Sequence, residues 1–359
     1  MRDGSPRESV DLDAALKLGI YNAESLKKLG ETSRREFLID GLIARRTANL
    51  VVGNSGLGKT PLMVSLGLSV AAGLPFLGRP AEQGRVLVCD GESSHPEFYE
   101  IMTNISGHMG LAGIPPDFFA WSPMWAPVQD YEDAFGPAHL ERIVATIQPD
   151  LAIIDPVRLF FPKAEGKSED TIGMFRTLRN MTRRHGCAWV LVHHRRKIDQ
   201  NYQISLETDA LQWFQQSCGS LALVNHSDTR LGIDLPKENV GKEADLVVAG
   251  FVRSHGRVGP LYLGRVFDEE GVPIAYHQLG GLDFLPGQFR GAYSKLPNEF
   301  RFSDVHKALG GKSGSNAAAF LMQTRSLGLV RKLDQRRGYQ KITENLEEAD
   351  SAKIPGDSV

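Results

Sequence analysis

A glycine-rich loop between an apolar run and a helix-compatible run constrains this chain most strongly. Residues 53–60 read Gly-Asn-Ser-Gly-Leu-Gly-Lys-Thr and fill every specified position of the pattern G-x-x-x-x-G-K-[ST], the P-loop. Residues 48–52 before it are mostly apolar and β-prone, and residues 61–72 after it have helix-compatible spacing, with Pro61 in a first turn that tolerates proline. Strand, loop and helix therefore follow one another in the order that a phosphate-binding loop requires.

The residue types in this loop match the chemistry of a nucleoside triphosphate. Glycines let backbone N–H groups turn toward phosphate oxygens, and the following helix directs the positive end of its dipole at the same phosphates. Lys59 can reach the β- and γ-phosphates, and the Thr60 hydroxyl is a ligand for Mg²⁺. We therefore expect ATP and Mg²⁺ as cofactors, with nucleotide contacts from Gly53, Asn54, Ser55, Gly56, Leu57, Gly58, Lys59, Thr60 and Pro61.

Hydrolysis of ATP needs further carboxylates, and two apolar runs end in acids. Residues 151–155 read Leu-Ala-Ile-Ile-Asp and predict a buried strand that delivers Asp155 to the Mg²⁺. Residues 85–92 end in Asp-Gly-Glu, and the carboxyl ends of parallel strands share one edge of a sheet. Glu92 is thus the expected activator of the attacking water, with Asp90 as its competitor. A solvated acid without a catalytic role is the alternative for Glu92.

A third apolar run reaches the same edge and ends in His193 and His194. A histidine there can hydrogen-bond the γ-phosphate and report its presence to the next loop, and either histidine can instead be structural. The segment from residue 195 to 216 is basic at first and then polar, and it is long enough to bind a ligand.

Strand and helix patterns alternate along the core, which predicts an α/β fold with a mostly parallel sheet, helices on both faces and an antiparallel extension. Strands are expected at residues 49–53, 85–90, 118–121, 151–155, 189–193, 221–225, 246–252 and 260–266, and helices at 61–72, 96–109, 137–146 and 169–185. The expected division is an N-terminal arm (1–45), an ATPase core (46–282), a linker (283–298), a small domain (299–343) and a disordered acidic tail (344–359).

The small domain has the pattern of a winged helix, with a helical cap on the core as the alternative. A helix at 303–309, with Ser303 as its possible cap, is followed by a turn, a helix at 315–327 and two short strands. Between residues 301 and 341 there are nine Lys or Arg residues against two Asp, a net charge of +7. The candidate DNA contacts in this domain are Lys312, Arg325, Arg336 and Arg337.

Composition restricts the class of protein further. The chain of 359 residues has a net charge of -2 and three cysteines, an odd and widely spaced set that argues against a disulfide framework or a zinc site. No apolar run approaches about 20 residues, and the first residues are polar, so we expect a cytoplasmic protein with no membrane span.

Together these elements resemble the RecA-like ring ATPases, most closely the RepA-type plasmid replicative helicases, over roughly residues 50–262. The resemblance places the catalytic glutamate on Glu92, the Walker B acid on Asp155 and the γ-phosphate-sensing histidine on His194. It also implies a strand that begins at Gly219-Ser220, followed by Arg230 as an arginine finger directed into a neighbouring subunit. The family's Ser-Lys motif appears as Ser254-His255, which leaves Arg253 or Arg257 for the finger role of that lysine.

The resemblance implies a hexameric ring with ATP sites between subunits, DNA (single-stranded) in the pore, and a replication partner protein. The basic pore residues would be Arg195, Arg196 and Lys197. The predicted function is a DNA helicase of a plasmid, phage or other mobile element. The alternatives are an ATP-switch regulator or mediator without unwinding activity and, least favoured, a small-molecule phosphotransferase, which leaves the basic loop and the winged helix unexplained.

Overall fold

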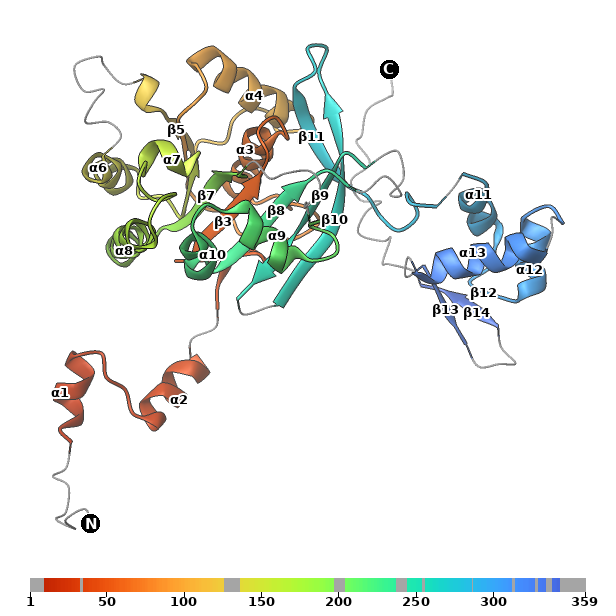
Figure 1. Ribbon diagram of the computed structural model, residues 1–359, viewed down its shortest axis with the longest axis horizontal. Helices are drawn as coiled ribbons and strands as arrows, with labels where there is room; N and C mark the ends of the chain where they lie inside the picture. Colours follow the sequence, from red (N-terminus) through yellow and green to blue (C-terminus); the bar gives the residue numbers. More distant parts are fainter. Residues whose placement is uncertain are drawn as a thin grey trace, which may run out of the picture.

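A nine-stranded sheet forms the centre of the protein (Figure 1). The structure is a computed structural model that describes residues 10–32, 35–125, 136–196, 204–236, 244–253, 256–285, 287–311, 314–326, 329–333 and 338–342. The strand order is β11-β10-β9-β8-β3-β7-β6-β4-β5. The six strands from β8 to β5 are parallel, and β9, β10 and β11 are antiparallel additions. This arrangement confirms the predicted fold class.

The bounds of the strands follow the apolar runs of the sequence closely. The nine strands are β3 (Ala48–Gly53), β4 (Val86–Asp90), β5 (Phe118–Trp121), β6 (Leu151–Asp155), β7 (Ala188–His194), β8 (Thr229–Asp234), β9 (Leu246–Val252), β10 (Gly256–Phe267) and β11 (Pro273–Gln278). Every residue of β3, β4 and β6 is buried, as expected for strands covered on both faces.

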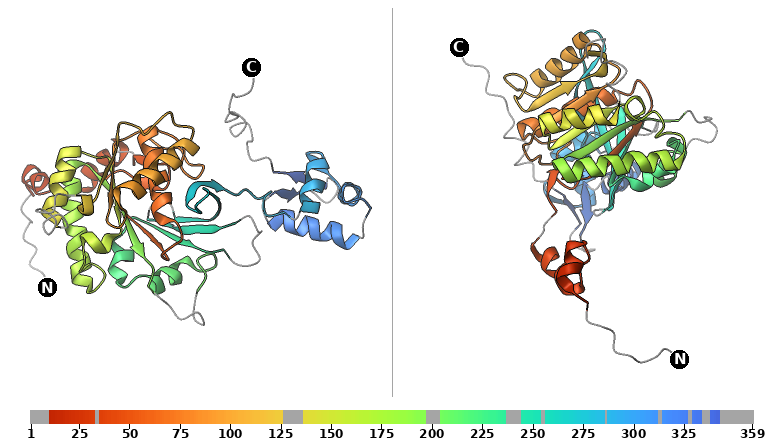
Figure 2. Two further views of the ribbon diagram at one scale, coloured as in Figure 1. Left: turned by 90° about the horizontal axis from the view of Figure 1, so that it is seen from above. Right: turned by 90° about the vertical axis from the view of Figure 1, so that its left-hand side faces the viewer.

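Helices cover both faces of the sheet (Figure 2). On one face lie α3 (Lys59–Ala72) and α4 (His95–His108). On the other lie α6 (Pro137–Ile147), α7 (Val157–Phe160), α8 (Ser168–His185), α9 (Ala210–Ser217) and α10 (Leu221–His226). Side chains alternate between the two cores along each strand: Val51 packs on the α3 side, and Leu50 and Val52 pack on the other. A short 3₁₀ turn, η1 (Pro123–Trp125), follows β5.

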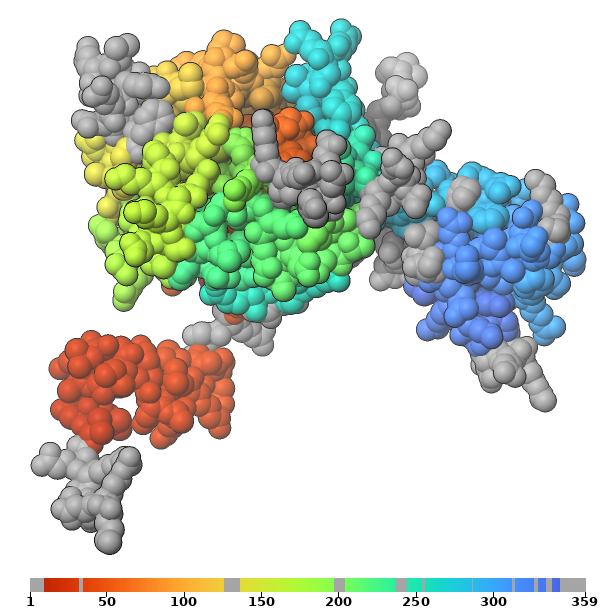
Figure 3. All heavy atoms as spheres, in the orientation of Figure 1, coloured from red at the N-terminus to blue at the C-terminus, as the bar shows by residue number. Residues whose placement is uncertain are grey.

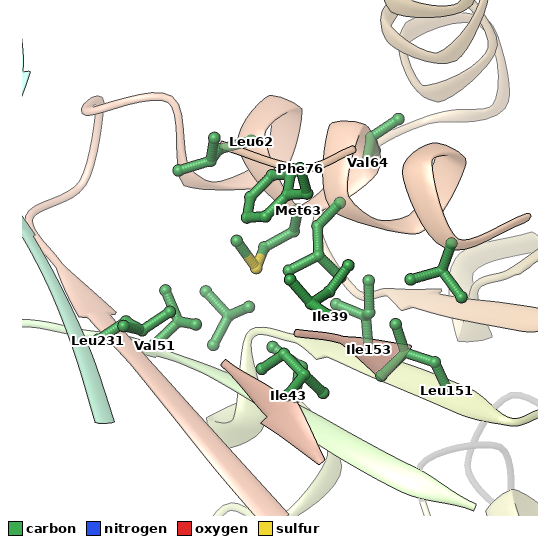
Figure 4. Packing of buried hydrophobic residues seen from close by; sticks show 14 of the residues in the cluster. Ile39, Ile43, Val51, Leu62, Met63, Val64, Phe76, Leu151, Ile153 and Leu231 are labelled. Carbon is green, nitrogen blue, oxygen red and sulfur yellow. The ribbon is translucent and has the colours of Figure 1, made fainter. Parts of the chain in front are cut away.

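The core begins earlier than the predicted boundary at residue 46. The two short strands β1 (Phe37–Ile39) and β2 (Ile43–Ala44) form a hairpin that buries Leu38, Ile39, Leu42 and Ile43. Figure 4 shows Ile39 and Ile43 among Val51, Met63 and Phe76. Residues 37–44 therefore belong to the hydrophobic core and not to the arm.

The helices α1 (Leu12–Lys17) and α2 (Ala23–Thr32) precede this hairpin. Figure 3 shows them as a separate group of red atoms beside the body. Leu12 and Leu26 are each about half exposed, at 51% and 55%. The sequence predicted one short helical piece between residues 11 and 29, and the structure has two.

The predicted strand at residues 221–225 is wrong, because this run forms α10. The Ser220 side chain accepts a hydrogen bond from the Ala222 N–H and caps the helix, so the segment led by Gly219-Ser220 is helical and not extended. The place beside β3 is taken by β8, a short strand in which the apolar residues Leu231 and Ile233 alternate with Arg230, Gly232 and Asp234.

The C-terminal residues form a module with its own apolar cluster. Its elements are α11 (Gly287–Lys295), β12 (Glu299–Phe300), α12 (Phe302–Ala308), α13 (Gly314–Ser326), β13 (Val330–Lys332) and β14 (Tyr339–Lys341). The strands form an antiparallel sheet in the order β12-β14-β13. The predicted linker at 283–298 thus contains a helix, since Phe289 and Tyr293 of α11 are buried in this cluster. The cap of α12 is Arg301 rather than Ser303, and its N–H donates to the Asp304 carboxylate.

Candidate active site

The P-loop connects β3 to α3 at the carboxyl edge of the parallel strands. Gly56 and Gly58 have φ angles of 79° and 80°, a left-handed conformation that favours glycine. A Cβ on Gly58 would lie 2.8 Å from the Tyr276 hydroxyl, and one on Gly53 would lie 2.9 Å from the Ile233 carbonyl oxygen. The loop conformation and the close approach of its neighbours therefore both require glycine.

Lys59 is folded back onto this loop. Its Nζ donates a hydrogen bond of 2.7 Å to the Asn54 carbonyl, and the residue is only 5% exposed. Burial lowers the pKa of Lys59, and the nearby carboxylates of Asp155 and Glu92 partly oppose that effect. The ammonium is thus held at the position where the phosphates of a nucleotide would replace the carbonyl as its partner.

Thr60, in the first turn of α3, contacts Asp155 at the end of β6. The Thr60 hydroxyl donates to Asp155 Oδ2 at 2.7 Å, and Asp155 ends the buried strand β6. Burial raises the pKa of Asp155 to about 7, with a further contribution from the nearby Asp90. A buried carboxylate beside a threonine hydroxyl fits Mg²⁺, which prefers oxygen ligands and substrate phosphates.

Glu92 and Asp90 have different environments at the end of β4. Asp90 is 2% exposed and accepts hydrogen bonds from the backbone N–H groups of Glu92 and Ser93 and from the Ser93 hydroxyl. Its carboxylate therefore orders the loop that carries Glu92. The Glu92 side chain is half exposed at the same edge as Lys59 and Asp155. This geometry favours Glu92 over Asp90 for contact with a water molecule.

The two histidines at the end of β7 are also in different environments. His193 is buried, and its Nδ1 lies 2.9 Å from Glu165 Oε1, an ion-pair geometry that holds the ring in the core. His194 Nε2 lies 3.6 Å from Glu92 Oε1, and within the described residues neither of its ring nitrogens has a hydrogen-bond partner. Burial, and then the charge of Lys59, lower the pKa of His194. A neutral ring at neutral pH can donate one hydrogen bond to a phosphate oxygen.

Comparison with known proteins identifies the class of this domain. Residues 22–200 match the AAA domain family. Together with the sheet topology and the P-loop, this match supports a RecA-like P-loop ATPase domain in this region. No curated protein matches the sequence.

One solved structure that aligns with the chain is a KaiC-like protein of the hyperthermophilic archaeon Pyrococcus horikoshii OT3. The two sequences are 14% identical, the alignment covers 68% of this chain and 99% of that chain, and the TM-score is 0.42.

A further charged residue of the ATPase domain site escaped the sequence analysis. Arg158 lies on α7, and its Nη2 donates to Glu92 Oε1 at 3.2 Å. The sequence signal for Arg158 was its position three residues after Asp155, at the end of an expected strand. Residues that directly follow a parallel strand lie at the carboxyl edge of the sheet, where the site forms.

The three candidate finger arginines lie outside this group of residues. Arg230 is half-buried on β8, where it pairs with Leu50 of β3. Leu50 lies three residues before the end of β3 at Gly53. Arg253 Nη1 lies 3.3 Å from Asp228 Oδ1, and Arg257 donates to the Glu207 carbonyl. Their finger roles require a second subunit and stay predictions. Ser254 and His255 fall outside the described residues.

Arg195 is not available for DNA in this conformation, which corrects its prediction as a pore-loop contact. It is 8% exposed, donates to Asp234 Oδ2 and to the Ser217 hydroxyl at 3.0 Å each, and its guanidinium lies 4.8 Å from the Trp213 ring centroid. The next residue, Arg196, is exposed. Lys197, Lys312, Arg336 and Arg337 fall outside the described residues, and Arg325 is exposed on α13.

Other features of the described chain are simpler. The three cysteines are buried and free. Within the described ranges no group of three or more His, Cys, Asp or Glu residues is arranged to hold a metal ion. No described helix combines the length and apolar character needed to cross a membrane.

Proposed function

We propose that the protein hydrolyses ATP with Mg²⁺ and uses the energy to act on DNA as a ring-forming helicase of a mobile element. The observation that supports hydrolysis is the convergence of Lys59, Thr60, Asp155, Glu92 and His194 at one sheet edge, from four separate strands. A P-loop alone binds nucleotide, whereas hydrolysis also requires a carboxylate near the reacting phosphate.

Each side chain has a distinct task in this proposal. Lys59 exchanges the Asn54 carbonyl for phosphate oxygens, and Thr60 and Asp155 hold the Mg²⁺. The bound ion supplies neutralisation of the phosphate charge. Glu92 orients the attacking water and accepts its proton, and His194 donates a hydrogen bond to the terminal phosphate.

The C-terminal module supports the DNA part of the proposal. Its order of helix, strand, two helices and a two-stranded hairpin is that of a winged helix, in which the second helix of the pair enters a DNA groove. A hollow of about 590 Å³ lies between α13 and β13, lined by Met322, Arg325, Val330, Arg331 and Lys332. Three cations around one hollow provide charge complementary to a phosphate backbone.

The ring, the arginine finger and single-stranded DNA in the pore follow from the resemblance to RepA-type helicases. Arg230, Arg253 and Arg257 remain the candidates for a finger in a neighbouring site. Such a finger contributes about 10³–10⁵ to the rate of phosphoryl transfer in other nucleotide hydrolases. A replication partner that loads the ring is part of the same proposal.

One observation favours the alternative, an ATP-dependent regulator that does not unwind DNA. Arg195, the first of the three basic residues after β7, is engaged in a buried ion pair with Asp234. A pore loop with fewer free cations holds a DNA strand less strongly, whereas a switch requires only that the loop changes conformation.

The proposal is tested by measuring ATP turnover, strand displacement and molecular mass with and without single-stranded DNA. We expect the wild-type protein to hydrolyse ATP and Glu92→Gln to abolish this turnover while ATP binding is retained. The control is Glu82→Gln, which changes an exposed glutamate paired with Arg45 and should leave turnover unchanged. A DNA-stimulated hexamer that separates strands supports the helicase. A non-unwinding dimer with slow turnover supports the regulator, and the lack of any turnover would refute both.

A further inference from the structure

Arg158 occupies an unusual place at the proposed ATP site. It follows Asp155 by three residues, on the single-turn helix α7, and its guanidinium donates to Glu92 Oε1 at 3.2 Å. The side chains of Arg158 and Glu92 are 51% and 47% exposed, so the pair lies at the open side of the site. An exposed ion pair of this kind contributes little to stability, about 0–1 kcal/mol. Folding therefore does not require it.

Glu92 Oε1 faces two groups at once. The same oxygen that accepts from Arg158 lies 3.6 Å from His194 Nε2. In this conformation the proposed base is thus held by an arginine and lies beside the proposed phosphate sensor. A carboxylate that is engaged with a guanidinium is a weaker proton acceptor than a free one.

Arg158 also acts electrically on the rest of the site. After burial and the neighbouring carboxylates, its charge is a further influence that lowers the pKa of Lys59, and it acts in the same direction on His194. The guanidinium and His194 also contact the same Glu92 oxygen, so Arg158 lies beside a residue that would contact the terminal phosphate.

We propose that Arg158 senses the terminal phosphate of ATP by exchanging Glu92 for that phosphate, which frees Glu92 to orient water. A terminal phosphate carries more negative charge than a carboxylate, and its oxygens match the fork of an arginine. ADP lacks this group, so the Arg158–Glu92 pair remains intact with ADP bound. The exchange couples the availability of the base to the presence of the substrate, and it rests on the proposed ATPase function.

The test is a comparison of dissociation constants for Mg²⁺-ADP and for Mg²⁺ with an ATP analogue whose β- and γ-phosphates are joined by nitrogen. We expect Arg158→Ala to reduce the preference for the analogue over ADP about tenfold, since a charged hydrogen bond is lost, and to change ADP affinity little. Arg158→Lys retains part of the preference. The matched control is Arg85→Ala, which removes a similarly exposed ion pair with Asp117 at the opposite end of β4.

If Arg158 exchanges Glu92 for the terminal phosphate, a second result is expected that attraction between Arg158 and the phosphate alone would not produce. Removing the competing carboxylate with Glu92→Ala tightens analogue binding, and this gain disappears when Arg158→Ala is present. An unchanged preference in Arg158→Ala, or a Glu92→Ala gain that is independent of Arg158, would overturn the inference while the ATPase proposal stands. Failure of the wild-type protein to bind either nucleotide contradicts the proposed function itself, and the inference with it.

Discussion

At the scale of single residues, burial of the Asp155 carboxylate in the site lowers the stability of the folded protein when that carboxylate is ionised. The carboxylate is 4% exposed and near the acids Asp90 and Glu92, and these surroundings raise its pKa to about 7. In the unfolded chain an aspartate has a pKa of about 3.9. Between these values the folded state binds the proton that the unfolded state releases, so stability is lost as the pH rises from about 4 to about 7.

We therefore expect the free energy of unfolding of the nucleotide-free protein to decrease between pH 5 and pH 8 through Asp155. Asp155→Asn removes this part of the decrease and stabilises the protein at pH 8, in urea unfolding followed by circular dichroism. Asp150→Asn, which removes an ion-pair partner of Arg45 at the opposite sheet edge, retains the decrease. An Asp155→Asn protein with the wild-type pH dependence would contradict the raised pKa.

A comparison of two P-loop glycines distinguishes the cost of backbone strain from the cost of steric contact. Gly56 and Gly58 share a φ angle near 80°, but a Cβ on Gly56 meets nothing within 4 Å. A Cβ on Gly58 would lie 2.8 Å from the Tyr276 hydroxyl, which itself donates to the Gly58 carbonyl at 2.7 Å. We expect Gly56→Ala to cost about 1 kcal/mol and Gly58→Ala about 1–2 kcal/mol more, measured as unfolding free energies. Equal losses of unfolding free energy in the two variants would show that the Tyr276 side chain moves away from the added methyl group at no cost.

At the scale of elements, the segment after β7 is fastened to α9 and β8 by Arg195. Asp234 Oδ2 accepts from Arg195 Nη1 and, at 2.7 Å, from Trp213 Nε1. Removing one partner of a buried ion pair leaves the other charge uncompensated.

Arg195→Ala is therefore expected to reduce the free energy of unfolding by about 3 kcal/mol. The exposed neighbour Arg196 provides the matched control, and Arg196→Ala should change stability by less than about 0.5 kcal/mol. Thermal and urea unfolding measure both. If Arg195→Ala lowered DNA affinity without any loss of stability, the residue would be a DNA contact as the sequence predicted.

Local patterns predicted the elements that carry the nucleotide chemistry. Long apolar runs that end in Gly53, Asp90, Asp155 and His194 are strands because both of their faces are buried. By contrast, the strands β8 and β11 of the large sheet were missed, and α10 was predicted as a strand. A short apolar run such as residues 221–225 fits either conformation, and the cap from Ser220 decided between them.

At the scale of the whole molecule, the structure divides its apolar clusters near residue 285. The two clusters on the faces of the large sheet extend to Tyr276, and the third includes Leu282 and residues from Leu285 onward. Phe284 contacts Tyr262 of β10, with ring centroids 4.9 Å apart. We therefore expect the stability of the ATPase domain not to depend on the C-terminal cluster.

A chain of residues 1–284 is expected to unfold cooperatively at nearly the temperature of the main transition of the full chain. A chain of residues 1–295 keeps α11 but lacks the elements that bury Phe289 and Tyr293, and we expect it to aggregate. Calorimetry and light scattering distinguish the two. A large loss of stability in the shorter chain would show that the module supports the core.

The sequence by itself determined the P-loop, the strand that precedes it, the parallel sheet and the acids and histidines at the strand ends, because each depends on neighbours in the chain. Only the tertiary structure decided which of two adjacent candidates faces the site: Glu92 rather than Asp90, and His194 rather than His193. Strands bring these residues together, but Asp90 is buried and bonded to its own loop and His193 is bonded to the distant Glu165, which leaves Glu92 and His194 facing the site. For the same reason, the tertiary structure brought Arg158 beside Glu92 and placed Arg195 in the core.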